Sequence, residues 1–257
     1  MKQVITFQLS RLFRYKPFLW SIIAYFAVTF LVVHSLYLSL NYFRLDINIK
    51  QGIFDHNSIW FNICWLIKYA NLLISFLFIG IIANDFRYGM IKQNIINGFT
   101  KKQVIATYTL SSIVFALFSL VLISSISLIY GVESSKTFQW SDIAKGLFGF
   151  FFYTIIVLQF CMLLTLILRK SVPTIMSLVI IYLIGEPLLG FVFDYYTNTD
   201  YSKFLPFSLI AQLLPQPILM QTIKTISLES HIIWIGSCSY FLLYTIGSYV
   251  YLKFKDL

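Results

Sequence analysis

Runs of apolar residues long enough to cross a lipid bilayer dominate this chain. A helix needs about 20 such residues to span the hydrocarbon core. Of the 257 residues, 59% are hydrophobic and only 11% are charged, whereas a soluble domain carries about 25% charged residues. The mean hydropathy is +0.81. We therefore expect an all-α polytopic membrane protein, in which lipid surrounds most side chains.

Six segments are long enough to cross: residues 17–40, 62–83, 105–130, 147–168, 172–193 and 232–252. Charged residues and turn formers gather between these segments, as expected for connections outside the bilayer. We interpret residues 1–257 as a single transmembrane domain with six transmembrane helices.

Lysine and arginine predict the orientation, because cytoplasmic segments carry an excess of both. With the N-terminus inside, the inner segments hold most of the nineteen basic residues, namely Lys2, Arg11, Arg14, Lys16, Arg87, Lys92, Lys101, Lys102, Arg169, Lys170, Lys253 and Lys255. We expect both termini in the cytoplasm and the protein in the cytoplasmic (inner) membrane. This topology and attraction to anionic lipid account for the net charge of +9 without a nucleic-acid partner.

Residues 1–16 predict a helix that lies in the membrane surface. Ile5, Leu9 and Phe13 share one face at helical spacing, and Arg11 lies largely on the opposite face. A basic lead-in without regular structure is the alternative.

A polar, basic segment, NDFRYGMIKQNIINGFTKKQ at residues 84–103, interrupts the apolar runs. Ile91, Ile95 and Phe99 recur at four-residue spacing and Ile96 widens this stripe, which predicts a short amphipathic helix from about residue 87 to residue 97.

Capping signals surround that short helix. Gly98 can end it by taking the left-handed conformation without a side-chain clash. Thr100 and Gln103 match a capping box, and Phe99 and Val104 stand where a hydrophobic staple would close the entry to the third span. Residues 84–104 are therefore expected to form a rigid cytoplasmic elbow, suited to mechanical contact with a soluble partner.

The segment NDFRYGMI, followed by NGFTKKQ, resembles the intracellular loop of type-2 ABC transporter permeases. That loop has an acidic or amide residue, an aromatic residue, a Gly-Thr-Ile-like step, and a Gly-Ser/Thr-Arg-like turn into the third span. The six-span layout is also similar, as is the Leu205-Pro206 step in a long outer connection. Met90 stands where the family often has Thr, and Lys101 where it often has Arg.

The resemblance implies that the loop docks onto a separate P-loop ATPase and that a second permease copy or a sister permease lies alongside. It implies that the ATPase-coupling loop uses Asp85, Arg87, Gly89, Gly98, Thr100 and Lys101. The alternative is that Gly98 and Thr100 only cap helices and that the bases only keep the loop in water. The chain contains no G-x-x-x-x-G-K-[ST], so ATP and Mg²⁺ are expected on the partner, with no cofactor or metal bound by this chain.

Two ionisable residues fall inside predicted spans. Lys68 and Glu186 lie at similar depth from the outer surface, where an unpaired charge costs on the order of 3 kcal/mol or more. We predict that the two side chains approach each other and form an ion pair, and that Pro187 kinks the fifth span beside the carboxylate. Snorkelling of Lys68 to the headgroups is the alternative for that residue.

The outer connection at residues 194–231 contains a segment, residues 201–222, that is too apolar for an ordinary loop. Pro206, Pro215 and Pro217 interrupt it too often for a crossing. We interpret it as short re-entrant helices in the outer leaflet.

These features together predict the permease subunit of an ATP-driven ABC exporter, with no enzymatic activity of its own. Spans rich in Phe, Ile and Leu favour a hydrophobic or amphipathic substrate. An ion-coupled carrier or a structural membrane protein without an ATPase is the alternative. The absence of an internal repeat, and few polar residues in the spans beyond Lys68, Asn71 and Glu186, argue against a carrier. Scattered histidines and the lack of an H-E-x-x-H motif argue against an intramembrane enzyme.

Overall fold

The computed structural model describes residues 16–42, 59–131, 140–214 and 228–255, and every regular element within these ranges is a helix. Five helices in this part of the chain are long and apolar enough to cross a membrane, and a bent pair makes a sixth if its two helices form one span. The all-α class is therefore confirmed, and the length and apolar character of these helices are consistent with a multi-pass membrane protein. The interfacial helix predicted for residues 1–16 falls almost wholly outside the described residues.

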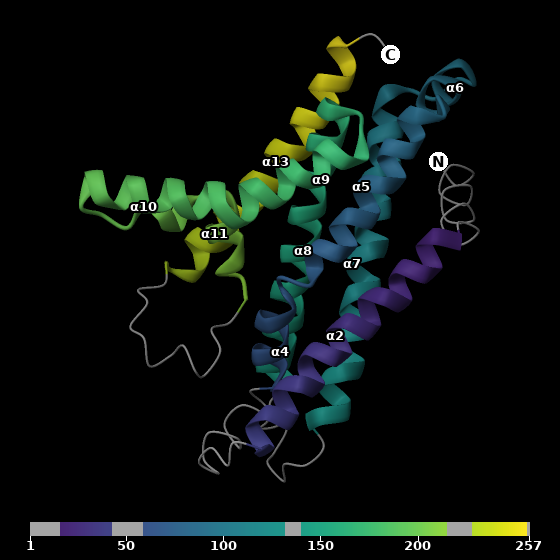
Figure 1. Cartoon of the computed structure of the whole chain (residues 1–257). Helices are drawn as coiled ribbons and strands as arrows, with labels where there is room; N and C mark the ends of the chain where they lie inside the picture. The colour runs from purple at the N-terminus through teal and green to yellow at the C-terminus, as the bar shows by residue number, and fades with distance from the viewer. Residues whose placement is uncertain (1–15, 43–58, 132–139, 215–227, 256–257) are drawn as a thin grey trace.

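Four predicted spans correspond to single long helices: α2 (Lys16–Tyr42), α7 (Lys101–Gly131), α8 (Trp140–Leu168) and α13 (Ser230–Phe254). In Figure 1 these helices lie alongside one another, and the short helix α6 (Met90–Ile96) sits at the end of the bundle where the chain terminates. We call this the loop end.

The second predicted span, residues 62–83, is not one continuous helix. It divides into α4 (Ile59–Ile67) and α5 (Asn71–Arg87), which are bent by 46° relative to each other. At the break, the Leu72 N–H donates to the Tyr69 carbonyl at 3.1 Å, a three-residue turn that interrupts the helical ladder. The two helices together are long and apolar enough to form the predicted span, which would then be bent.

The fifth predicted span is a continuous helical rod with an irregular middle. It consists of α9 (Ser171–Ile180), the π-helical η1 (Ile181–Gly185) and α10 (Glu186–Thr197). The Glu186 N–H donates to the Ile181 carbonyl, five residues back. Pro187 has no N–H and crowds the preceding turn, so the disturbance predicted there takes the form of a π turn. Figure 1 shows α10 leaving the bundle sideways.

The centre of the bundle is α8, which packs against α5, α7 and α13. Within its apolar stretch 61% of the residues are buried, compared with 17% in α2 and 17% in the α9–α10 rod. The other two therefore present most of their apolar surface outward, as lipid-facing helices do.

Polar side chains are more numerous in the interior than the sequence analysis assumed. The buried ones in the described ranges are Thr29, Asn71, Ser75, Asp85, Ser111, Ser112, Ser119, Ser127, Thr154, Gln159, Thr165, Thr174, Glu186, Ser237 and Ser248. Contacts that join different helices include Tyr25 with Ser119 at 2.8 Å, Asn71 with Thr154 at 3.0 Å, and Gln159 with Ser112 at 2.8 Å. Small polar residues of this kind allow close helix packing in membranes.

Candidate functional site

The predicted coupling loop connects α5 to α7 through two glycine turns. Gly89 (φ 66°) lies between α5 and α6, and Gly98 (φ 92°) follows α6. The Phe99 N–H donates to the Asn94 carbonyl at 3.0 Å, which closes the second turn. Both glycines adopt a conformation that side chains disfavour. Because Gly89 interrupts the helix, α6 begins at Met90, and Arg87 belongs to α5 rather than to the predicted amphipathic helix.

The capping box is confirmed. The Gln103 backbone N–H donates to the Thr100 hydroxyl at 3.3 Å, and the Thr100 backbone N–H donates to the Gln103 side-chain oxygen at 2.8 Å. Each side chain satisfies a backbone donor that the first turn of α7 leaves without a helical partner. The start of α7 is therefore locally specified.

The short helix α6 presents one apolar face inward and one apolar side chain outward. Ile91 is buried, and Ile95 and Phe99 pack against the core. Ile96 is 83% exposed, so the prediction that it widens the buried stripe was wrong. At 3.6 residues per turn, Ile95 lies about 40° around the helix axis from Ile91, whereas Ile96 lies about 140° away.

Asp85 lies inside the bundle and not on the loop surface. Its side chain is 2% exposed, and its Oδ2 accepts a hydrogen bond from the Tyr108 hydroxyl at 2.9 Å. This contact joins the last turn of α5 to the first turns of α7. Asp85 therefore holds the loop against the bundle, and the surface-facing role that the family resemblance implied for it does not fit its burial.

The two bases singled out in the loop occupy different surroundings. Arg87 is exposed, and its guanidinium lies 5.8 Å from the centre of the Tyr88 ring. Lys101 is half-buried and its Nζ donates to the Lys253 carbonyl at 3.2 Å, near the end of α13. A cation is favourable at the C-terminal end of a helix. Lys101 therefore ties α7 to α13, whereas Arg87 is accessible.

The exposed surface of the loop combines apolar and polar groups. We define the α6 surface as Arg87, Tyr88, Lys92, Gln93 and Ile96, all of which are exposed. Exposed aromatic, aliphatic and arginine side chains on a rigid element are typical of protein contact sites. Tyr88 and Ile96 were not predicted to belong to this surface. Ile96 was placed on the buried stripe, although ideal helical spacing puts it about 140° from Ile91.

A cavity of about 480 Å³ lies beside this surface, between the α5–α6 turn and the α8–α9 turn. Its lining includes the basic residues Arg87, Lys92, Arg169 and Lys170 and the acidic residue Asp85. Arg169 follows α8 in the left-handed conformation, with φ 57°. No pattern in the sequence indicated that the α8–α9 turn meets the loop, because the two segments are far apart along the chain.

The predicted ion pair between Lys68 and Glu186 is not formed, although both residues lie within the described ranges. The Lys68 ammonium lies 4.4 Å from the centre of the Trp65 ring and 4.9 Å from that of Tyr69. A cation placed over aromatic faces is stabilised without a carboxylate. At the break between α4 and α5, the Lys68 charge is therefore stabilised by neighbouring aromatic rings.

Glu186 instead caps the short helix α11 (Pro206–Ala211). Its Oε2 accepts a hydrogen bond from the Phe207 N–H at 2.8 Å, and its Oε1 accepts one from the Ser208 N–H. A carboxylate at a helix N-terminus satisfies free donors and complements the helix dipole. One signal could have pointed to this contact: Leu205, at the N-cap position of α11, offers no side-chain acceptor.

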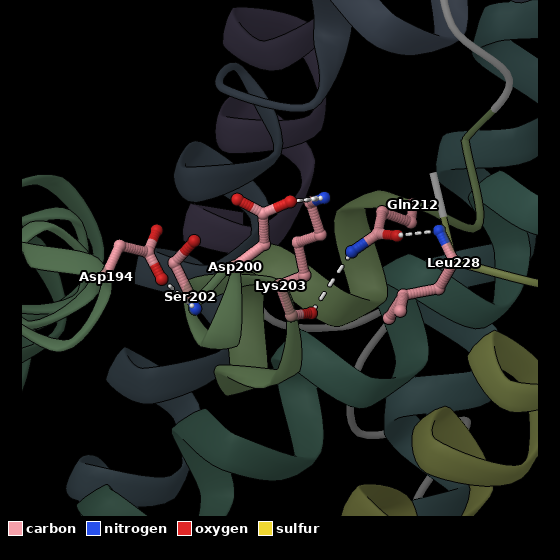
Figure 2. Close-up of polar contacts among 6 residues, drawn as sticks. All are labelled: Asp194, Asp200, Ser202, Lys203, Gln212 and Leu228. Atoms are coloured by element: carbon pink, nitrogen blue, oxygen red, sulfur yellow. Dashed lines mark hydrogen bonds and ion pairs between the residues drawn. The ribbon is translucent and has the colours of Figure 1, made fainter. Parts of the chain in front are cut away.

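Further contacts hold the segment between α10 and α13. Figure 2 shows Asp194 accepting a hydrogen bond from the Ser202 N–H at 2.9 Å. It also shows the Gln212 side chain joining two parts of the connection. The Gln212 Nε2 donates a hydrogen bond to the Lys203 carbonyl at 3.1 Å, and its Oε1 accepts one from the Leu228 N–H at 3.2 Å. The short 3₁₀ helix η2 (Tyr201–Phe204) lies within this network.

A glycine on α8 allows α11 and the residues after it to approach closely. A Cβ atom at Gly149 would lie 2.1 Å from the Leu213 carbonyl oxygen. No side chain fits there without displacing backbone. The described parts of the connection, residues 194–214 and 228–231, therefore include the short helices η2 and α11 and are attached to the bundle by remote contacts. The re-entrant position in the outer leaflet stays a prediction.

The comparisons with known proteins add no assignment. No protein-family model and no curated protein matches the chain. Within the described ranges, no group of three or more His, Cys, Asp or Glu side chains could hold a metal ion. The loop, its α6 surface and the adjoining cavity are thus the features from which a function can be argued.

Proposed function

We propose that this chain is the membrane-spanning permease subunit of an ATP-driven ABC exporter, with the loop end in the cytoplasm. The observation that carries the proposal is a short helix, α6, fixed between two left-handed glycines and a capping box, which presents an exposed surface at the end of the bundle. A connector without a mechanical role would not need this local specification.

In this proposal a separate P-loop ATPase binds the α6 surface. The exposed Ile96 is the apolar anchor, and Arg87 and Lys92 at the rim attract an acidic face of the partner. ATP and Mg²⁺ bind to the ATPase. Closure of the ATPase around ATP moves α6, and the chain itself performs no chemistry.

The contacts behind α6 provide a route for that movement into the bundle. The hydrogen bond between Tyr108 and Asp85 couples α5 to α7, and the Lys101 contact with Lys253 couples α7 to α13. Displacement of α6 would therefore shift three helices together. A second copy or a sister permease completes the pathway, for which a hydrophobic or amphipathic substrate is the proposed cargo.

Co-purification from native membranes tests the proposal. The full chain is extracted in mild detergent, and its partners are identified by mass spectrometry. We expect a P-loop ATPase, with recovery reduced at least about tenfold by Ile96→Asp, since an interface anchor contributes about 2 kcal/mol or more. Asn198→Asp is the matched control, because it adds the same charge at an exposed position at the end of α10. Thermal unfolding in detergent verifies that both variants fold.

An ion-coupled carrier is the second candidate, and the polar contacts inside the bundle favour it. Gln159 bonds to Ser112 and Asn71 to Thr154 in a buried environment. Recovery of the folded chain without an ATPase, together with transport driven by an ion gradient in vesicles that contain this chain alone, would contradict the exporter and support the carrier.

A further inference from the structure

The cavity beside the loop is strongly cationic. Arg87, Lys92, Arg169 and Lys170 line it, against a single carboxylate from Asp85, which already accepts a hydrogen bond from Tyr108. Within the described ranges, none of the four cations forms an ion pair. Its volume of about 480 Å³ is within the range of small-molecule sites, about 300 to 1,000 Å³. The cavity therefore has the charge and the size to take an anionic group.

The side chain of Arg169 is positioned by a ring contact, and its Nε forms no hydrogen bond. Its guanidinium lies 5.6 Å from the centre of the Phe86 ring, and its backbone N–H donates to the Thr165 carbonyl at 2.8 Å. Its Nε is buried and has no hydrogen-bond partner. A buried donor without a partner carries a desolvation cost of about 1 to 3 kcal/mol, which an anion in the cavity would remove.

The start of α9 adds backbone donors to the same place. Ser171 lines the cavity and begins α9, and the N-cap residue Lys170 makes no side-chain capping bond. The first N–H groups of a helix are free to bind an anion, and a phosphate is the group they commonly bind.

The cavity also lies where two candidate spans meet end to end, which corresponds to a membrane boundary whichever way the bundle is inserted. One candidate span ends at Leu168 and the next begins at Ser171, beside the end of α5 at Arg87. Phospholipid headgroups occupy this level of the bilayer. Basic pockets between membrane helices at this level recognise anionic headgroups by their phosphates.

From these observations we infer that the cavity binds the phosphate of an anionic phospholipid headgroup. The Arg169 guanidinium supplies planar donors to the phosphate oxygens, and Arg87, Lys92 and Lys170 supply charge. A bound headgroup would join the α8–α9 turn to the loop and so stiffen the base of α6. This inference concerns the chain alone and does not depend on an ATPase.

The test uses the purified, delipidated full chain in a neutral detergent. Phosphatidylglycerol, phosphatidylcholine or inorganic phosphate is added, and the thermal unfolding midpoint and the number of retained lipids are measured. We expect phosphatidylglycerol to raise the midpoint and to be retained, with an affinity that falls as salt screens the cations. Phosphatidylcholine, which has no net charge, and inorganic phosphate should produce little change.

Paired variants locate the site. Arg169→Gln with Lys170→Gln should weaken phosphatidylglycerol binding at least about tenfold, because charge-assisted hydrogen bonds are lost. Lys102→Gln with Lys255→Gln is the control, since it removes the same charge from two exposed residues near the loop end whose ammonium groups lie over tyrosine rings. If the first pair fails to fold, Arg87→Gln with Lys92→Gln replaces it.

Three results would overturn the inference. Equal phosphatidylglycerol binding by the cavity and control variants would place the lipid elsewhere. A midpoint shift with inorganic phosphate as large as that with lipid would indicate a soluble anion. Loss of a co-purifying protein from the cavity variant, with lipid binding unchanged, would assign the cavity to an acidic protein partner.

Discussion

The loop between α5 and α7 and the connection between α10 and α13 meet the same physical requirement in different ways. Both must satisfy the free N–H groups at the start of a helix. In the loop, Thr100 and Gln103 cap α7 from three residues apart. In the connection, Glu186 caps α11 from 21 residues away. A local cap can be predicted from the spacing of two residues in the sequence, whereas a remote cap cannot, because it depends on the fold around it.

The sharpest way to test that contrast is to remove the remote cap. Glu186→Ala should lower the free energy of unfolding by about 3 kcal/mol, since hydrogen bonds to charged groups contribute about 1.5 to 3 kcal/mol each. Titration with denaturing detergent measures this change. Glu186→Lys combined with Lys68→Glu should not recover the lost stability, because the two residues are not partners. Full recovery of the free energy of unfolding in the double variant would support the ion pair between Lys68 and Glu186 that the sequence analysis predicted.

The close approach of the Leu213 backbone to Gly149 should be nearly as sensitive to substitution as the remote cap. Gly149→Ala should cost about 1 to 3 kcal/mol, as overpacking does, because the new Cβ would lie 2.1 Å from the Leu213 carbonyl oxygen. Gly80→Ala is the matched control. It lies within α5 with nothing within 4 Å of the added atom, so we expect a gain of about 0.5 to 1 kcal/mol from helix propensity. A similar effect at both positions would mean that α11 does not pack on α8.

The local cap should have a smaller, separable effect. Thr100→Ala should cost about 1 kcal/mol, because one capping hydrogen bond is lost. Thr100→Ser keeps the hydroxyl and should stay close to the parent protein. The same unfolding titration provides the measurement. A loss at Thr100 larger than that at Glu186 would reverse the order that this comparison predicts.

Substitution of Lys68 should change the free energy of unfolding least. Among the described residues, its ammonium contacts the rings of Trp65 and Tyr69, which are near it in sequence. A cation–π contact at a partly exposed site contributes about 0.5 to 1 kcal/mol. Lys68→Met keeps the apolar stem and should therefore change stability by less than Thr100→Ala does. A loss as large as that of Glu186→Ala would show that Lys68 neutralises a buried acid.

The features that sequence reasoning predicted are those set by short-range patterns. Apolar length predicted the long helices, Gly98 marked the end of α6, and Thr100 with Gln103 marked the start of α7. Two errors have different causes. The break after Ile67 has no Pro or Gly to mark it, so apolar composition did not reveal it. The outward position of Ile96 agrees with ideal helical spacing, about 140° from Ile91, which the assignment to the buried stripe overlooked.

The remaining misses involve residues that the fold brings together from far apart. Arg169 joins the loop only because α8 returns to the loop end, and Glu186 reaches α11 only because the chain doubles back after α10. From the sequence, serine and threonine in the spans were interpreted as small residues without a specific contact. In the structure, Ser112 and Ser119 form hydrogen bonds between helices. Pairing between distant segments cannot be read from a single chain by periodicity.

Crosslinking from the centre of the α6 surface tests the exporter proposal most directly. Ile96→Cys in a Cys238→Ser background leaves the buried Cys64 and Cys161 as the other thiols. A reagent that joins this thiol to a neighbouring protein on illumination is applied in native membranes, and the adduct is sequenced. The proposal predicts a P-loop ATPase joined at residue 96. Efficient labelling of the thiol with no ATPase in any adduct would contradict it.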